Sequence, residues 1–172
     1  MSKRIKVPVE LLEHCLKVAR TRFRPSGRDW DLGRELVSTW AECALATDFG
    51  YPHDLRVKWN DVVAFADSNL PDVVLYGPTD FLLDAKTHLS DKPSTLIPRR
   101  DANKLHDHWF YVAMQHLGQG EFEVFGYRVG AHWRLAYSKP HDAWRMRPHD
   151  LLPLDYLKAA WATCEGEGFL VG

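Results

Sequence analysis

The stretch PDVVLYGPTDFLLDAKTH, from Pro71 to His88, places two apolar runs on either side of a Gly-Pro turn. The runs Val73–Tyr76 and Phe81–Lys86 are rich in consecutive apolar residues, which is typical of strands covered on both faces of a sheet. An aspartate precedes the first run, and an aspartate and a lysine stand near the end of the second. Charged side chains leave water only where something compensates them. The sequence therefore predicts a buried hairpin with a charged cluster at one end.

The geometry of this hairpin decides whether its charges meet. Side chains alternate along a strand, so Asp84 and Lys86 share one face. Asp72 shares that face only if paired residue numbers have an even sum, such as 156, which an odd-numbered loop or a bulge near Gly77 allows. Two carboxylates about 4 Å apart repel by on the order of 4 kcal/mol at an effective dielectric of about 20, so we expect a cation beside them.

A divalent metal ion would supply that cation. Carboxylate oxygens from Asp72 and Asp84, with the backbone carbonyl of Ala85, are the hard ligands that Mg²⁺ prefers, and we expect Mn²⁺ to substitute for it. A bound ion lowers the pKa of a coordinated water and neutralises charge on a phosphate, while Lys86 would orient that water or help to deprotonate it. The residue types therefore indicate phosphodiester hydrolysis.

The motif itself resembles that of the PD-(D/E)XK nuclease superfamily. It consists of Pro71-Asp72, 11 intervening residues, and then Asp84-Ala85-Lys86. The resemblance implies a restriction endonuclease-like α/β fold, in which a mixed central β-sheet is flanked by helices. It also implies that the two aspartates bind Mg²⁺ and that Lys86 serves the attacking water.

Many members of that superfamily add a glutamate from the helix that precedes the hairpin. Here the expected helix, Asp31–Asp48, carries Glu35 and Glu42, which are seven residues apart and so share one face. We expect this face to lie roughly opposite the apolar stripe of the helix. Both glutamates stay candidates, and Glu35 is slightly favoured because it follows the glycine common in that segment of the family.

Three further residues are candidates for contact with substrate phosphate. His88 lies two residues beyond Lys86 on the same strand face, and Arg100 and Lys104 stand at the start of the helix expected after the hairpin. Related enzymes often place a basic or amide side chain there. The resemblance also implies DNA as the partner and a homodimer, because each subunit of such enzymes cuts one strand.

The main functional hypothesis is thus a Mg²⁺-dependent endonuclease that hydrolyses DNA, of the restriction, recombination or phage type. One alternative is a Holliday-junction resolvase of the same superfamily. Another is a catalytically silent module that keeps the nuclease scaffold for binding nucleic acid or protein. RNA also stays open as a substrate, because nothing in the sequence reads a 2′-hydroxyl.

The rest of the chain predicts helices and strands that interleave around one sheet, which is typical of the α/β class. We expect a single nuclease domain over residues 1–172, with a core at about 31–137 and a helix added at each end. Residues 60–70 fit either a short helix or a strand. The other expected elements are helices at Val9–Arg22, Asn103–Leu117 and Leu154–Cys164, and strands at Leu55–Trp59, Glu121–Val129 and Ala131–Tyr137.

The composition of the chain limits the compartments and partners that we expect. The chain is 45% hydrophobic and 26% charged, and no apolar stretch approaches the ~20 residues of a membrane span, so we expect no membrane association. The first residues lack the apolar segment of a secretory signal, and three cysteines without a C-x-x-C spacing favour reduced thiols in the cytoplasm. A net charge of −1 argues against a purely electrostatic DNA coat, although basic clusters such as Arg20–Arg28 are suited to phosphates.

Overall fold

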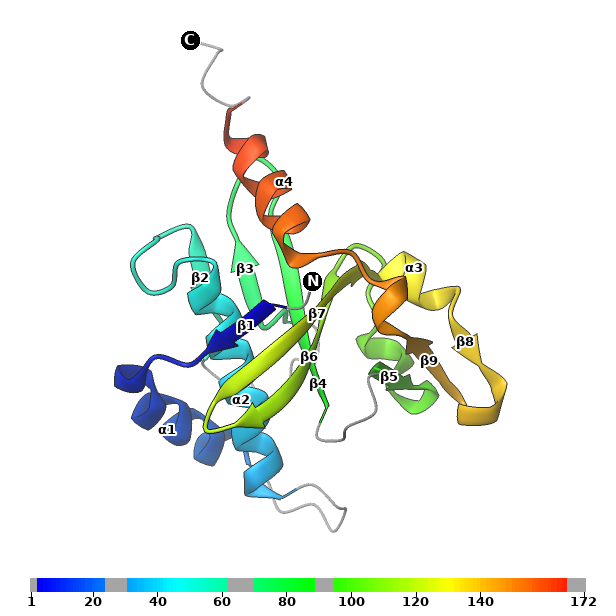
Figure 1. Ribbon diagram of the computed structural model, residues 1–172, viewed down its shortest axis with the longest axis horizontal. Coiled ribbons are helices and arrows are strands. Elements are labelled where there is room, and N and C mark those ends of the chain that lie inside the picture. Colours follow the sequence, from blue (N-terminus) through cyan, green and yellow to red (C-terminus); the bar gives the residue numbers. More distant parts are fainter. Residues whose placement is uncertain (1–2, 24–30, 62–69, 89–94, 167–172) are drawn as a thin grey trace.

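The computed structural model describes residues 3–23, 31–61, 70–88 and 95–166. They form a six-stranded sheet and a three-stranded sheet with helices around them (Figure 1). The larger sheet has the order β1-β7-β6-β4-β3-β2, and the smaller one has the order β5-β9-β8. In the larger sheet, β4 pairs in parallel with β6, whereas the other neighbours are antiparallel. The predicted mixed α/β class, with a mixed central sheet flanked by helices, is confirmed.

The bounds of these elements are as follows. The larger sheet consists of β1 (Lys3–Lys6), β2 (Val57–Trp59), β3 (Val73–Leu75), β4 (Phe81–His88), β6 (Phe110–Gly118) and β7 (Glu121–Val129). The smaller sheet consists of β5 (Thr95–Pro98), β8 (Tyr137–Ser138) and β9 (Ala143–Met146). The helices are α1 (Leu12–Arg22), α2 (Leu32–Asp48), α3 (Gly130–Arg134) and α4 (Leu154–Gly166), with short 3₁₀ turns η1 (Val9–Leu11), η2 (Arg99–Lys104), η3 (Lys139–His141) and η4 (Pro148–Asp150).

The β3–β4 hairpin has the register that brings its charged residues to one end. Val73 pairs with Leu83 and Leu75 pairs with Phe81, so each pair of numbers adds to 156. The predicted even register is therefore confirmed. The residues between the last pair, 76–80, form a longer connection than the three-residue loop expected around Gly77, but their number is still odd.

Helix α2 covers one face of the larger sheet. Asp31 caps its start, because its carboxylate accepts the backbone N–H of Arg34 at 2.8 Å. The later turns, from Ala41 to Ala46, are buried, since α2 packs against both the sheet and α1. The main core lies here and includes inward-facing residues of β3, β4 and β6 such as Val73, Leu83 and Val112.

The smaller sheet, α3 and η2 cover the opposite face. Alternation along β4 and β6 turns Leu82 and Tyr111 toward this side, where they meet a second core. Figure 1 shows the small sheet and α3 on one side of β4 and β6, with α1 and α2 on the other. The buried members of the second core are Ile97, Leu105, Trp109, Tyr111, Trp133 and Met146.

Two predicted elements are wrong. The helix expected over Asn103–Leu117 is instead the end of η2 followed by strand β6, whose residues Tyr111 to Met114 are all fully buried. A short apolar run buried on both faces of a central strand has no period that separates it from a buried helix. The strand expected over Ala131–Tyr137 is mainly helix α3, in which Gly130 and Trp133 face inward three residues apart.

The other predictions agree with the structure to varying degrees. Strand Glu121–Val129 has the predicted bounds, the helices α1, α2 and α4 lie where they were expected, and β2 is shorter than the predicted Leu55–Trp59. Strands β1, β5 and β9 were not predicted. Of the open segment 60–70, residues 62–69 lie outside the described residues. Within the described part of the chain, no helix has both the length and the apolar character needed to cross a bilayer.

Candidate active site

Asp72 lies at the end of the hairpin, one residue before β3. The backbone N–H of Ala85 donates to Asp72 Oδ2 at 2.7 Å, which fixes the carboxylate beside the residue that separates Asp84 from Lys86. In the β3–β4 pairing, residue numbers add to 156, and the next pair after Val73 and Leu83 is Asp72 and Asp84. The two aspartates therefore lie across from each other. The two aspartates predicted from the motif therefore come together at one end of the hairpin.

Lys86 forms an ion pair with Asp84. The distance from Lys86 Nζ to Asp84 Oδ1 is 2.5 Å, and the two side chains are only 26% and 13% exposed. The Lys86 ammonium also lies 5.6 Å from the ring centroid of Tyr111, on the neighbouring strand β6. Burial alone would lower the pKa of Lys86, but the charges of Asp84 and Asp72 outweigh it and raise this pKa. In this state Lys86 is therefore an ammonium that compensates acids rather than a base.

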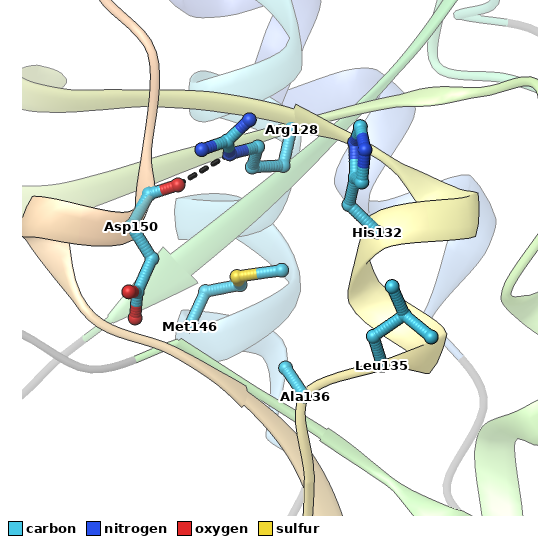
Figure 2. Close-up of a pocket in the computed structure, with 6 residues that line it drawn as sticks. All are labelled: Arg128, His132, Leu135, Ala136, Met146 and Asp150. Atoms are coloured by element: carbon cyan, nitrogen blue, oxygen red, sulfur yellow. Dashed lines mark hydrogen bonds between the residues drawn. The ribbon is translucent and has the colours of Figure 1, made fainter.

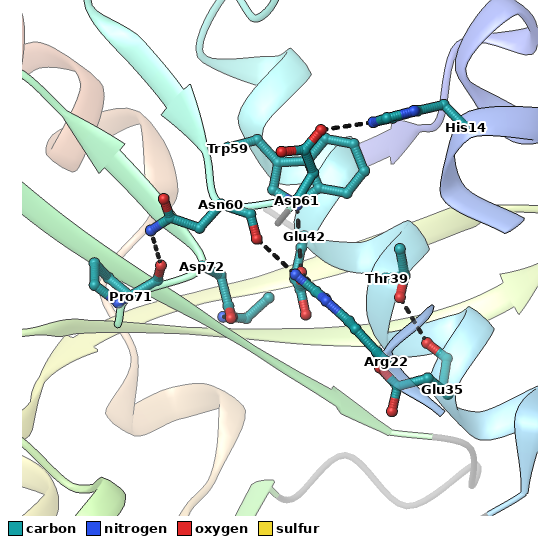
Figure 3. A network of polar contacts seen from close by, with 11 residues as sticks. His14, Arg22, Glu35, Thr39, Glu42, Trp59, Asn60, Asp61, Pro71 and Asp72 are labelled. Atoms are coloured by element: carbon teal, nitrogen blue, oxygen red, sulfur yellow. Dashed lines mark hydrogen bonds and ion pairs between the residues drawn. The ribbon is translucent and has the colours of Figure 1, made fainter. Parts of the chain in front are cut away.

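Glu42, on α2, adds a third carboxylate, whose charge acts on Asp72. It is 5% exposed, and its Oε2 atom accepts from Arg22 Nη1 at 2.5 Å and from the Trp59 indole at 3.3 Å. Arg22 Nη2 donates in addition to the carbonyl of Asn60 at 2.6 Å. Figure 3 shows Arg22, Glu42 and Asp72 converging from three different elements.

The placement of the two glutamates corrects one prediction. Glu42 is buried against the sheet, so the glutamate face of α2 does not lie opposite the buried side of this helix. Glu35 lies farther toward the start of α2 and is half-buried, and its backbone carbonyl accepts from the Thr39 hydroxyl at 2.9 Å. Its charge still acts on Arg22 and Glu42. This placement favours Glu42 over Glu35 as the glutamate of the cluster.

Burial raises the pKa of two carboxyl groups of the cluster, those of Asp72 and Glu42. Desolvation raises the pKa of Asp72 well above its usual value, and the negative charges of Glu42 and Asp84 raise it further. Desolvation likewise raises the pKa of Glu42, although Arg22 opposes that shift. A buried acid whose neighbours are acids is stabilised by an added cation or by a proton. The cluster is therefore electrostatically suited to a positive ligand.

The donor set fits a single hydrated metal ion better than a cage of protein ligands. Among residues 3–23, 31–61, 70–88 and 95–166, no three His, Cys, Asp or Glu side chains gather as a ready-made metal site. Mg²⁺ needs no such cage, because it commonly binds one or two carboxylates and keeps several waters. Asp72, Asp84 and the carbonyl of Ala85 supply a set of this kind.

The three predicted phosphate-binding residues are placed only by their backbone. His88 ends β4, whereas Arg100 and Lys104 lie in the 3₁₀ turn η2 rather than at the start of an α-helix. Their side chains fall outside the described residues. Their predicted contacts with phosphate stay predictions.

Sequence reasoning missed the inward role of Arg22. It belongs to an arginine-rich segment that was interpreted as a phosphate-binding patch, yet its side chain is only 15% exposed and pairs with Glu42. Its position in the last turn of α1 gives a weak hint, since long side chains at a helix end can reach a neighbouring element. No spacing rule in the sequence links Arg22 to Glu42.

Described residues line two surface hollows on the side of the smaller sheet. One is lined by Arg128, His132, Leu135, Ala136, Met146 and Asp150, and in it the Arg128 guanidinium donates to the carbonyl of Asp150 (Figure 2). The other lies against Leu82, Leu105 and Trp109. Neither hollow is lined by Asp72, Asp84 or Glu42, so the charged cluster is distinct from both.

No known family model, curated protein or solved structure matches the chain.

Proposed function

We propose that the protein is a Mg²⁺-dependent nuclease that hydrolyses phosphodiester bonds in DNA. The observation that carries the proposal is the hairpin register, which sets Asp72 beside the Asp84-Ala85-Lys86 segment. Two carboxylates, a backbone carbonyl and an ammonium then meet at one end of β4. The raised pKa of Asp72 supports a cation as the natural ligand of this cluster.

In the proposed mechanism each side chain has a distinct task. A divalent ion, when bound, supplies a water of lowered pKa and offsets the charge of the phosphate. Asp72 and Asp84 would hold the ion, with the Ala85 carbonyl as a further oxygen ligand. Lys86 would turn its N–H groups from Asp84 toward the nucleophilic water and the phosphate, stabilising the negative charge that develops there.

The proposal includes the restriction endonuclease-like fold and a homodimer, both implied by the motif. The mixed sheet, with α2 placed before the hairpin and Glu42 beside it, supports that fold. The main alternative within this proposal is a resolvase, which would cut branched DNA. A catalytically silent binding module is the alternative from another class.

Cleavage assays test the proposal directly. Supercoiled plasmid, a four-way DNA junction and a single-stranded RNA are each incubated with the protein in Mg²⁺, Mn²⁺ or EDTA. We expect metal-dependent cleavage of DNA that Asp84→Asn and Lys86→Met each reduce by about 10²-fold or more. Asp80→Asn and Lys58→Met are matched controls, because both residues are exposed and lie outside the cluster.

The substrates separate the alternatives. Preferential cutting of the junction would identify the resolvase, and cutting of RNA alone would reassign the substrate. Binding of DNA with no cleavage in either metal would support the silent module. Cleavage that survives both cluster substitutions would refute the proposed site.

A further inference from the structure

Arg22 occupies an unusual place for a surface-helix arginine. It comes from the last turn of α1, yet its guanidinium ends inside the charged cluster, where it holds Glu42 and the carbonyl of Asn60. Glu42 is also fixed by Trp59, and both bonds end on the same oxygen, Oε2. Arg22 and Glu42 are thus a preformed, largely buried ion pair.

The charges of the cluster are arranged in order. Lys86 lies against Asp84 at one end, and Arg22 lies against Glu42 at the other. Asp72 lies between them, and the hydrogen bond to its Oδ2 atom comes from a backbone N–H rather than from a side-chain cation. The positive charge of Arg22 also acts on Asp72 and on Glu35.

We propose that Arg22 is a built-in second cation of the centre, which holds Glu42 so that only one divalent ion binds, between Asp72 and Asp84. This inference rests on the proposed nuclease function. Two-metal hydrolytic sites use their second ion to offset charge on the substrate and to hold additional carboxylates. Here a guanidinium already holds Glu42, and a guanidinium stays charged at any working pH.

Displacement of Arg22 by a second ion is unfavourable. The guanidinium would lose its carboxylate partner while still largely buried, and breaking one side of a buried ion pair is strongly destabilising. Arg22 is therefore a positioning residue that acts through Glu42 and through its charge.

Metal stoichiometry tests this inference without any cleavage assay. The intact protein is titrated with Mn²⁺, and free Mn²⁺ is followed by its electron paramagnetic resonance signal. We expect one Mn²⁺ per chain in the unmodified protein. Asp72→Asn and Asp84→Asn should each weaken binding by more than about 100-fold, whereas Glu42→Gln should weaken it by only about tenfold, the lower end of the range for groups outside the coordination sphere.

Variants of Arg22 test the inference more directly, through the number of Mn²⁺ ions that each binds. Arg22→Gln removes the charge and frees Glu42, so we expect a second, weaker Mn²⁺ site that disappears again in Arg22→Gln combined with Glu42→Gln. Arg22→Lys keeps the charge and should keep one ion. If Arg22→Gln fails to fold, as judged by circular dichroism, two ions in the unmodified protein or loss of the ion in Glu42→Gln would still overturn the inference.

The unfavourable outcomes are distinguishable. Two Mn²⁺ ions in the unmodified protein, or loss of the single ion in Glu42→Gln, would overturn the role of Arg22 and leave the nuclease proposal standing. Absence of any Mn²⁺ binding would overturn both. One ion with an unchanged stoichiometry in Arg22→Gln would also overturn the inference, because Glu42 would then not need Arg22 to exclude a second ion.

Discussion

At Asp72, the surroundings that suit a bound cation lower the stability of the metal-free protein. Its burial and the nearby charges of Glu42 and Asp84 raise its pKa, so the folded, metal-free protein favours the protonated carboxyl. The folded state then binds more protons than the unfolded chain as the pH rises above the ordinary aspartate pKa of about 4. Stability is therefore lost as the pH increases through the raised pKa of the folded state.

Asp72→Asn should consequently stabilise the metal-free protein at high pH. The amide is neutral, and its oxygen can still accept the Ala85 N–H. We expect the free energy of unfolding to increase by on the order of 1 kcal/mol at pH 8, with a smaller gain at pH 5, where Asp72 is closer to its neutral form. Urea denaturation in EDTA at the two pH values measures this difference.

Asp80→Asn serves as the control, because Asp80 is exposed and its carboxylate also accepts a backbone N–H, from Gly77. It should not reproduce the gain at pH 8. A loss of stability in Asp72→Asn at both pH values would show that the carboxylate charge is compensated within the fold. The destabilising role assigned to Asp72 would then be incorrect.

At the level of elements, the sequence predicts a segment well where its pattern has one physical meaning. The β3–β4 hairpin has a turn between two apolar runs, and its charged residues require one register, so both the element and its register were predictable. Strand β6 contains the equally apolar run from Phe110 to Met114 without alternation, and the glycine turn that follows Leu117 can end a buried helix as well as a central strand. Its identity depends on β4 and β7, which pair on either side of it.

The candidate site was predictable for similar reasons and only in part. Asp72, Asp84 and Lys86 are related by local strand geometry, and alternation along one strand suffices to relate two of them. Glu42 required the packing of α2 on the sheet, which its helical period alone does not give. Arg22 required the packing of α1 on α2 as well, so its place depends on two tertiary contacts that no local pattern encodes.

Helix α3 offers a test at this scale. It begins at Gly130, whose N–H donates to the Trp109 carbonyl at 2.9 Å, and a Cβ on Gly130 would lie 1.9 Å from the carbonyl oxygen of His106. Backbone cannot move aside as a flexible side chain can. We expect Gly130→Ala to lower the free energy of unfolding by about 2 kcal/mol or more, measured by urea denaturation.

The matched control is Gly33→Ala in the first turn of α2. A Cβ there would lie 3.2 Å from Asp31 Oδ1, the oxygen that caps α2, so this side chain would have to yield by a few tenths of an ångström, while alanine favours the helix. This variant should change the free energy of unfolding by no more than about 0.5 kcal/mol. Equal losses in the two variants would mean that the approach of Gly130 to His106 does not determine the position of α3.

At the scale of the whole molecule, both ends of the chain enter the same core. Ile5 from β1 and Cys15 from α1 pack in the main core, as do Leu157 and Trp161 from α4. The motif-based expectation placed the core at about 31–137 and treated the terminal helices as additions. Their burial in the main core indicates that the hairpin and its charged cluster depend on packing from both ends.

Trp161 tests this dependence most directly. It is 7% exposed, its ring packs against Phe49 at a centroid distance of 6.0 Å, and its indole donates to the carbonyl of Tyr76 in the hairpin connection at 3.1 Å. Trp161→Ala should lower the free energy of unfolding by about 3 kcal/mol or more, because it leaves a cavity and removes that bond. The unfolding transition should stay single, with far-ultraviolet circular dichroism and tryptophan fluorescence giving the same midpoint, since α4 belongs to the main core.

Tyr156→Ala is the control on the same helix. Because this aromatic side chain is 62% exposed, its removal should change the free energy of unfolding by no more than about 0.5 kcal/mol. A small loss in Trp161→Ala, or an early separate transition in the unmodified protein, would instead identify α4 as a peripheral element whose unfolding leaves the hairpin and its charges in place.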